Sequence, residues 1–179
     1  MKIEETTDIL FHGARGGLEF KRIYTSDLAQ LCDACPFGRG TTHNYAIRLT
    51  GTFQTGGSGR VVMPEEGTGR LFSYVGTDSD GALVFATSGT VGQLGDVVRR
   101  LTDGTLEYRR SDASVMRFNS GGRLLTITDR NGNITTLTYT GTNLTRITDA
   151  VGRSIDLTYD FASRISTATD PLGRIWRYT

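Results

Sequence analysis

Two cysteines and two histidines are the residues whose types best suit redox or metal chemistry. Cys32 and Cys35 have the spacing of a redox pair, but such a pair acts at the start of a helix in a strand-helix-strand unit, and Pro36 indicates a loop. Adding His12 and His43 gives four zinc ligands, yet His12 lies 20 residues before Cys32, whereas structural zinc ligands usually come in two close pairs. We therefore predict no cofactor and no metal, with redox activity and structural zinc as the less favoured interpretations.

Three aspartates recur at nearly equal intervals towards the C-terminus. Asp129, Asp149 and Asp170 are separated by 20 and 21 residues, so repeats stacked in register would align their carboxylates in a row. Such a row repels itself without a cation and could bind Ca²⁺. The interpretation that we favour, because it applies to each aspartate singly, is that each carboxylate accepts hydrogen bonds from the amides of its own turn.

Four aromatic side chains near the C-terminus could form a surface on which sugar rings stack: Tyr139, Tyr159, Trp176 and Tyr178. Packing in the core and between strands is the commoner use of such rings. No nucleophile-elbow pattern accompanies His43, and no glycine-rich loop carries the lysine of a phosphate site. We therefore predict that the protein is not an enzyme and has no catalytic residue, and a carbohydrate-binding or cell-surface-binding module is the alternative function.

The aspartates belong to a repeat with a period of 20 to 21 residues. In each unit a glycine follows the aspartate after three positions, and in the first two units a tyrosine follows it after ten. The repeat positions are Asp129, Gly132 and Tyr139, then Asp149, Gly152 and Tyr159, then Asp170 and Gly173. The third tyrosine would fall one residue beyond Thr179, so we expect the chain to be a piece of a longer one. Periods of this length indicate arrays or solenoids.

Strands must position these residues. Thr135, Leu137 and Tyr139 occupy every second position, which is typical of a half-buried strand. The Asn131-Gly132 pair tolerates the positive φ of a tight hairpin turn. Hairpins stacked side by side bury the apolar face that each neighbour exposes. We predict an all-β fold of stacked antiparallel β-hairpin repeats that form a curved, spiralling sheet.

The composition supports this fold class and excludes several partners. Glycine is frequent (23 residues) and proline is rare (3), which suits short strands and tight turns better than a helix bundle. A formal net charge of +1 provides no electrostatic footprint for nucleic acid. No apolar stretch approaches the roughly 20 residues of a membrane span, and the N-terminal segment lacks the apolar run of a Sec signal peptide. We therefore expect no nucleic-acid partner and no membrane insertion.

A less regular leader precedes the repeats. We predict an irregular β-rich leader over residues 1–115 and about three repeats, the last truncated, over 116–179, joined in one sheet system. The expected leader strands are residues 18–24, 45–49, 60–63, 71–75, 82–86, 97–101, 105–109 and 115–118, with a short helical turn at 26–31.

The repeats closely resemble the YD repeats of bacterial Rhs proteins. The segments that carry the resemblance are Thr128-Asp129-Arg130-Asn131-Gly132-Asn133, Thr148-Asp149-Ala150-Val151-Gly152-Arg153 and Asp170-Pro171-Leu172-Gly173-Arg174. Residues 17–26 and the Phe37-Gly38-Arg39-Gly40 run resemble the segment that precedes the repeats in that family. The family usually has a tryptophan after that run, and this chain has Thr41.

The resemblance implies a section of a large β-sheet shell that spirals around a C-terminal effector, usually the toxin of an interbacterial or anti-host weapon. Animal teneurins share a similar shell. The implied partners are downstream Rhs repeats and an enclosed C-terminal toxin domain that lies outside this chain. The implied route leads from the bacterial cytoplasm to secretion or to the cell surface through a specialised secretion system. The last strand, near residues 174–179, would expose an unpaired edge, so we also expect edge-to-edge self-association of this chain alone.

Overall fold

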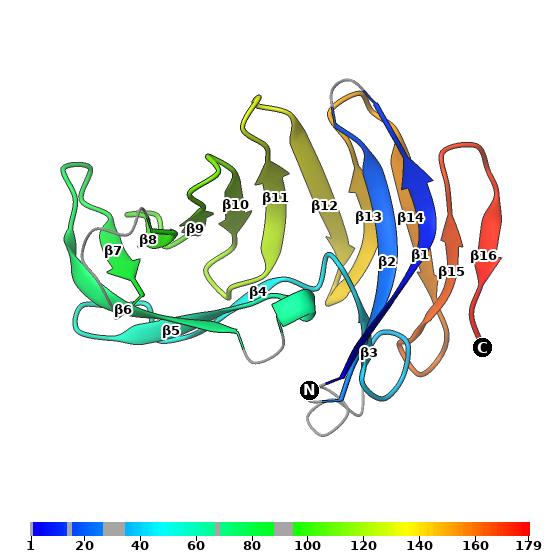
Figure 1. Cartoon of the computed structure of the whole chain (residues 1–179), viewed down its shortest axis with the longest axis horizontal. Coiled ribbons are helices and arrows are strands. Elements are labelled where there is room, and N and C mark those ends of the chain that lie inside the picture. Colours follow the sequence, from blue (N-terminus) through cyan, green and yellow to red (C-terminus); the bar gives the residue numbers. More distant parts are fainter. Residues whose placement is uncertain (1, 14–15, 27–34, 67–68, 88–94) are drawn as a thin grey trace. The chain divides into compact units, whose positions relative to one another are not determined.

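The computed structural model in Figure 1 describes residues 2–13, 16–26, 35–66, 69–87 and 95–179. Within these ranges the regular elements are β-strands, apart from one 3-10 turn, η1 (Pro64–Glu66). The predicted all-β repeat sheet is confirmed. Among the described residues, no helix is long and apolar enough to cross a membrane. The chain divides into two compact units, one made of Met1–Ala46 and Asn133–Thr179 and the other of Ile47–Gly132.

The first unit contains two groups of antiparallel strands. The leader sheet has the order β1 (Ile3–Phe11), β2 (Leu18–Thr25) and β3 (Thr41–His43). The repeat strands each pair with the next in sequence: β12 (Ile134–Thr140), β13 (Asn143–Thr148), β14 (Ser154–Tyr159), β15 (Ile165–Thr169) and β16 (Ile175–Arg177). The repeats are therefore hairpins laid side by side.

In this unit, alternate side chains of the repeat strands lie on one buried face, as their period-two pattern predicts. The register places Ile147 opposite Ile155 and Leu157 opposite Ala168, and all four side chains are buried. Thr138, next to Leu137 in the same strand, is exposed on the other face. The leader supplies a second buried set, made of Ile9, Leu18, Phe20 and Ile23.

Specific contacts join the leader to the repeat strands. The amide of Ile165 donates to the carbonyl oxygen of Pro36 at 2.6 Å. The rings of Phe37 and Tyr178 meet edge to face, with centroids 4.8 Å apart. Figure 1 shows β1 and β2 lying over β13 to β15. The leader thus covers the apolar face that the repeats present.

The second unit is a run of eight strands, each antiparallel to the next. These strands are β4 (Arg48–Gly51), β5 (Ser58–Val62), β6 (Arg70–Thr77), β7 (Leu83–Ala86), β8 (Val97–Arg100), β9 (Leu106–Arg109), β10 (Val115–Phe118) and β11 (Leu124–Thr128). Fully buried aromatic side chains fill its core: Phe72, Phe85, Tyr108 and Phe118.

This unit curls until its first strand reaches its last hairpin. The amide of Leu49 in β4 donates to the carbonyl oxygen of Gly122 at 2.9 Å, and Arg48 forms an antiparallel bridge with Arg123. Gly122 has a φ of +79°, and a Cβ there would collide with the carbonyl oxygen of Leu49. Only glycine fits this close approach. The curvature expected of the sheet is thus present within this unit.

Some leader elements differ from those expected. Strand β1 was not predicted, because residues 4–7 are polar and all exposed, and it forms by pairing with β2 along its length. The strand expected at 45–49 begins only at Arg48. Tyr45 and Ile47 are buried, as residues of a strand facing the core would be, but they lie outside regular structure. The helical turn expected at 26–31 falls mainly on residues 27–34, which lie outside the described residues.

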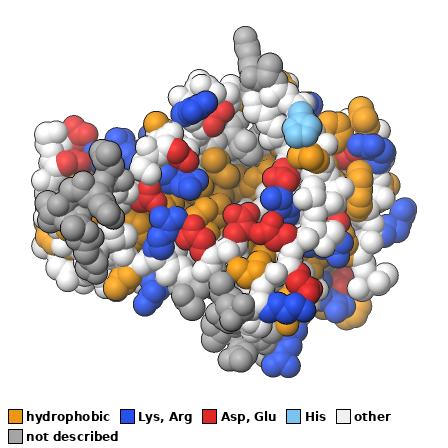
Figure 2. Space-filling model, in the orientation of Figure 1, with side chains coloured by type: hydrophobic (Ala, Val, Ile, Leu, Met, Phe, Trp, Pro, Cys, Tyr) orange, Lys and Arg blue, Asp and Glu red, His pale blue; other side chains and the backbone are white. Residues whose placement is uncertain are grey.

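Some arginines of the second unit form ion pairs across strands. The register aligns Arg99, Glu107 and Arg117 on β8, β9 and β10. Glu107 is only 2% exposed, and its carboxylate lies 2.8 Å from Arg117, 2.9 Å from Arg109 and 3.3 Å from Arg99. Figure 2 shows acidic and basic side chains interspersed on the face in view. A buried carboxylate needs such partners, so these arginines serve the fold.

A buried histidine lies at the end of the leader sheet. His43 is 4% exposed and its ring stacks on Phe20, with centroids 5.6 Å apart. Its Nδ1 atom has no hydrogen-bond partner among the described residues. Burial lowers the pKa of His43 from 6.5 to about 4, because the charged form loses its hydration. His43 is therefore a neutral core residue at neutral pH.

The first prediction concerns acid stability. Below pH 6.5 the unfolded chain binds a proton at His43 that the folded chain binds only near pH 4, so the folded state loses stability across this window. The full loss is about 3 kcal/mol. Urea unfolding at about pH 7 and about pH 5 measures this slope. His43→Phe should flatten it, whereas His12→Gln, at an exposed position, should leave it unchanged; equal slopes in all three proteins would contradict the prediction.

Candidate functional site

The repeat aspartates organise the turns between hairpin strands. Asp149 is 5% exposed, and its Oδ1 atom accepts hydrogen bonds from the amides of Val151 (3.0 Å) and Arg153 (2.9 Å). Its Oδ2 atom accepts from the Nε atom of Arg153 at 2.7 Å. Gly152 has a φ of +85°, the left-handed conformation that lets the chain reverse. One carboxylate thus holds two turn amides and one guanidinium.

The turn of the next repeat, at Asp170, has the same geometry. The Oδ1 atom of Asp170 accepts from the amides of Leu172 and Arg174, both at 2.9 Å, and Oδ2 accepts from Arg174 Nε at 2.6 Å. Gly173 has a φ of +80°. Burial alone would raise the pKa of Asp170, but the hydrogen bonds from Arg174 and Leu172 outweigh it and hold this pKa below its usual value.

The turn of the first repeat, at Asp129, is of the same kind but lacks the arginine. The Oδ1 atom of Asp129 accepts from the amide of Asn131 at 2.8 Å, and the amide of Gly132 donates to the Asp129 carbonyl oxygen at 3.0 Å. Gly132 has a φ of +81°. The position four residues after this aspartate is Asn133, so the arginine of the later turns has no counterpart.

A fourth turn of this type was missed by the sequence analysis. The Oδ1 atom of Asp160 accepts from the amides of Ala162 (2.8 Å) and Arg164 (2.9 Å), and Oδ2 accepts from Arg164 Nε at 3.0 Å. Ser163 takes the place of glycine, with a φ of +59°. The signal that could have found it is the spacing of aspartate and arginine by four residues.

The turn geometry favours hydrogen bonding over a calcium row as the role of these aspartates. In all three repeats the Oδ1 atom of the aspartate accepts a hydrogen bond from a turn amide. In the second and third repeats its Oδ2 atom accepts one from an arginine. In the described parts of the chain, no group of three or more His, Cys, Asp or Glu residues is placed to hold a metal ion. Cys32 lies outside the described residues, and Cys35 is buried and is not a free thiol.

The repeat tyrosines are packed and do not form one exposed surface. Tyr139 and Tyr159 are half-buried. The Tyr159 hydroxyl donates to the carbonyl oxygen of Leu144 at 2.8 Å, which ties its strand to the preceding hairpin. Burial raises the pKa of Tyr159 to about 12, so this donor keeps its proton.

Two of the turn arginines also fix the leader in place. The guanidinium carbon of Arg153 lies 5.9 Å from the ring centroid of Phe11, and that of Arg174 lies 5.6 Å from the same centroid. Arg153 also donates to the carbonyl oxygen of His12 at 3.3 Å. Both distances lie within the range of cation-π contacts. The end of β1 is thus held by two successive repeat turns.

The other two aromatic side chains of the predicted set, Trp176 and Tyr178, line a cavity of about 430 Å³ in the first unit. Leader residues also line it, among them Asp8, Arg22 and Phe37, and all three contact Tyr178. The structure therefore brings together two of the four aromatics and adds leader residues that sequence spacing did not connect with them.

Comparisons with known proteins agree with this geometry. A family model described as RHS Repeat matches residues 140–175, and a second, described as a domain of unknown function (DUF6531), matches residues 1–72. The chain is an Rhs/YD-repeat protein. No curated protein matches the chain.

One similar solved structure is the TCP10 domain of Danio rerio CPAP in complex with a peptide of Danio rerio STIL. It is 15% identical to this chain, with 98% of this chain and 99% of that chain covered, and the TM-score is 0.22. A likeness at this level carries no argument about fold or function.

The second prediction tests the turn carboxylate. Asp149→Ala leaves the amides of Val151 and Arg153 without their acceptor and Arg153 without its ion pair, so the free energy of unfolding should fall by about 2–3 kcal/mol. The matched control is Asp112→Ala, because Asp112 is exposed and its carboxylate contacts only neighbours in its own turn, Ser114 by hydrogen bonds and Arg110 by an ion pair. Urea unfolding measures both variants. Equal losses of unfolding free energy in the two variants would contradict the prediction, because the buried turn carboxylate would then stabilise the fold no more than an exposed one.

Proposed function

We propose that this chain is a structural section of a β-sheet shell that encloses a C-terminal effector, usually a toxin, encoded downstream. The observation that carries the proposal is the modular turn. The β13–β14 and β15–β16 hairpins are each closed by hydrogen bonds to an aspartate of their own turn, so units of this kind can be added without changing those before them. An array of this kind can extend until its sheet surrounds a guest.

The edge of β16 supports continuation of the array. This strand is last in the strand order, and its outer edge has no strand partner among the described residues. Leu172, in the preceding turn, and Ile175, the first residue of β16, are 71% and 47% exposed. Open strand edges with apolar neighbours readily pair with another strand. Downstream repeats are the proposed partner, and self-association through this edge is the proposed behaviour of the isolated chain.

The shell role needs no catalytic residue. The RHS repeat is a structural repeat, and the carboxylates, arginines and tyrosines described above have structural partners in turns and strands. The activity of the whole protein would then belong to the enclosed effector. We propose export through a specialised secretion system to the surface or the surroundings of a bacterial cell, since an enclosed toxin acts on another cell.

The third prediction tests enclosure in the intact protein. The coding frame should continue past Thr179 with further units of 20 to 21 residues, the spacing of the units in this chain. In the protein that this frame encodes, a protease should cleave the C-terminal effector slowly under native conditions and rapidly after denaturation. The same effector expressed alone is the control. A frame without further repeats, or an effector cleaved equally fast with and without the shell, would refute the proposal.

A further inference from the structure

We propose that Asn131 is a site of spontaneous deamidation, in which the backbone amide of Gly132 attacks the Asn131 side chain and water then completes the loss of ammonia. The side-chain amide is lost, and residue 131 becomes either aspartate or isoaspartate. Asn131 and Gly132 lie in the turn that joins β11 to β12. This proposal does not depend on the enclosure of an effector.

The residue that follows an asparagine controls the rate of this reaction. The chain contains five asparagines, and only Asn131 is followed by glycine. The other four precede Tyr45, Ser120, Ile134 and Leu144. Glycine has no Cβ, so nothing on the residue itself hinders the approach of its amide nitrogen to the asparagine Cγ atom. The sequence therefore confines the fast reaction to one position.

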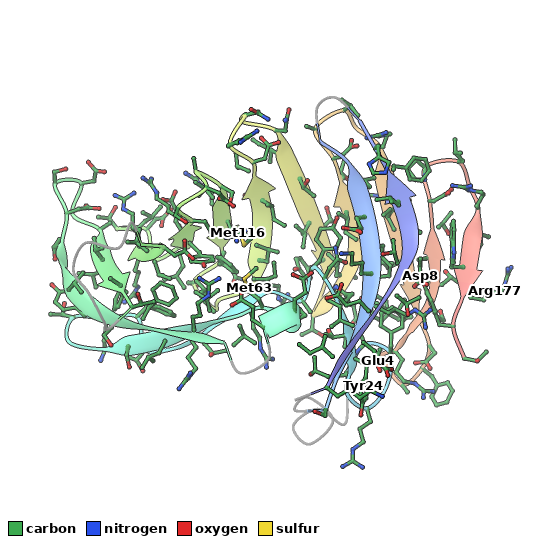
Figure 3. The ribbon with its side chains drawn as sticks, viewed as in Figure 1. Glu4, Asp8, Tyr24, Met63, Met116 and Arg177 are labelled. Atoms are coloured by element: carbon green, nitrogen blue, oxygen red, sulfur yellow. The ribbon has the colours of Figure 1, made fainter. Side chains whose placement is uncertain are left out.

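The surroundings of Asn131 give water access to the reacting atoms. In Figure 3 this turn, at the top of the view, projects beyond the ends of both strands. Asn131 and Gly132 are both exposed, and the side-chain amide of Asn131 makes no hydrogen bond with the described residues. Asn119, by contrast, accepts hydrogen bonds at its Oδ1 atom from the amides of Gly121 and Arg123. The Asn131 side chain can therefore turn towards the Gly132 nitrogen.

The turn must open before the nitrogen can react, because the Gly132 amide donates to the Asp129 carbonyl oxygen at 3.0 Å. In the Asp149 and Asp170 turns, an arginine four residues after the aspartate also binds its carboxylate. Asn133 stands at that place in the Asp129 turn, so no guanidinium of its own spans this turn. Local opening needs less free energy where fewer such bonds must break. The repeat turn with the reactive pair is thus also the one without the arginine.

The reaction needs only solvent water and hydroxide as co-reactants. Hydroxide removes the proton of the Gly132 amide, and the nitrogen attacks Cγ of Asn131. The N–Cγ bond forms, the Cγ–Nδ2 bond breaks, and Nδ2 leaves as ammonia after taking a proton from water. Water then opens the resulting succinimide ring. Cleavage of the bond from the nitrogen to Cγ gives aspartate, whereas cleavage of the bond to the main-chain carbonyl carbon gives isoaspartate.

Both products alter the turn. In the aspartate form a second carboxylate stands two positions after that of Asp129, and the two like charges repel. The isoaspartate form lengthens the main chain by one atom before Gly132, which displaces the Gly132 amide from the Asp129 carbonyl oxygen. The later repeat turns have Val151 and Leu172 at the corresponding position and cannot react. Among the three repeat turns, only the first therefore changes as the protein ages.

The test is incubation of the 179-residue protein in neutral buffer at physiological temperature, followed over weeks by peptide mass spectrometry. The peptide that contains Asn131 should gain the mass difference between an amide and an acid, and electron-transfer fragmentation should detect the isoaspartate form. Protein unfolded in guanidinium chloride and incubated in parallel should react faster, because Asp129 no longer holds its Gly132 amide. Two results would overturn the proposal: an unreacted native protein when the unfolded protein is largely converted, or earlier conversion of another asparagine.

Three variants connect the rate of conversion with opening of the turn. Asn133→Arg places an arginine four residues after Asp129, as in the later turns, and should slow the conversion about two- to fivefold, the effect of an exposed ion pair. Asn133→Gln is the matched control, because it changes the same residue without adding a guanidinium, and it should not slow the conversion. Asp129→Ala removes the acceptor of the Asn131 amide and should speed the conversion about fivefold.

Circular dichroism confirms that each variant folds. Equal rates in Asn133→Arg, Asn133→Gln and Asp129→Ala would contradict the proposal, because the reaction would then not depend on the bonds that close this turn. Each of these outcomes leaves the shell function untouched.

Discussion

The carboxylate that closes each repeat turn is the interaction on which the rest of the first unit depends. In the Asp149 and Asp170 turns, one side chain satisfies two backbone amides and one guanidinium in a nearly buried position. Buried polar groups are costly unless they are paired, so each turn must supply its own partners. Because it does, the strands on either side are held in register, and apolar pairs such as Ile147 and Ile155 meet on one face.

The apolar face made in this way needs a cover, and the leader provides it. Phe11 lies against the arginines of two successive turns, so the side chains that close the turns also position the leader sheet. The second unit solves the same problem differently, by curling its eight strands around buried aromatic rings and joining β4 to the hairpin at Gly122. Burial of a sheet face thus governs both units, through a separate sheet in one and through curvature in the other.

Local features of the fold could be predicted from the sequence, and features that join distant segments could not. The 20-residue to 21-residue period and the Asp-x-x-Gly pattern located the turns at Asp129, Asp149 and Asp170, because the hydrogen bonds of a turn are made within five residues. The Asp160 turn was missed because Ser163 replaces the expected glycine. Strand β1 was missed because its polar residues show no alternation, and its pairing with β2 is what makes it a strand. The cavity joins Asp8 to Tyr178 across 170 positions of sequence, and no local pattern records such a contact.

The most direct test of this account is amide hydrogen exchange at Arg153 and Arg174, measured by NMR at residue resolution. Both amides lie in turns, where exchange is ordinarily fast, but each donates to a nearly buried carboxylate. The account predicts protection comparable to that of amides within β14, so that these turns open only when the unit unfolds. Exchange as fast as that of an exposed, open turn would contradict it, because the aspartates would then not hold the repeats together.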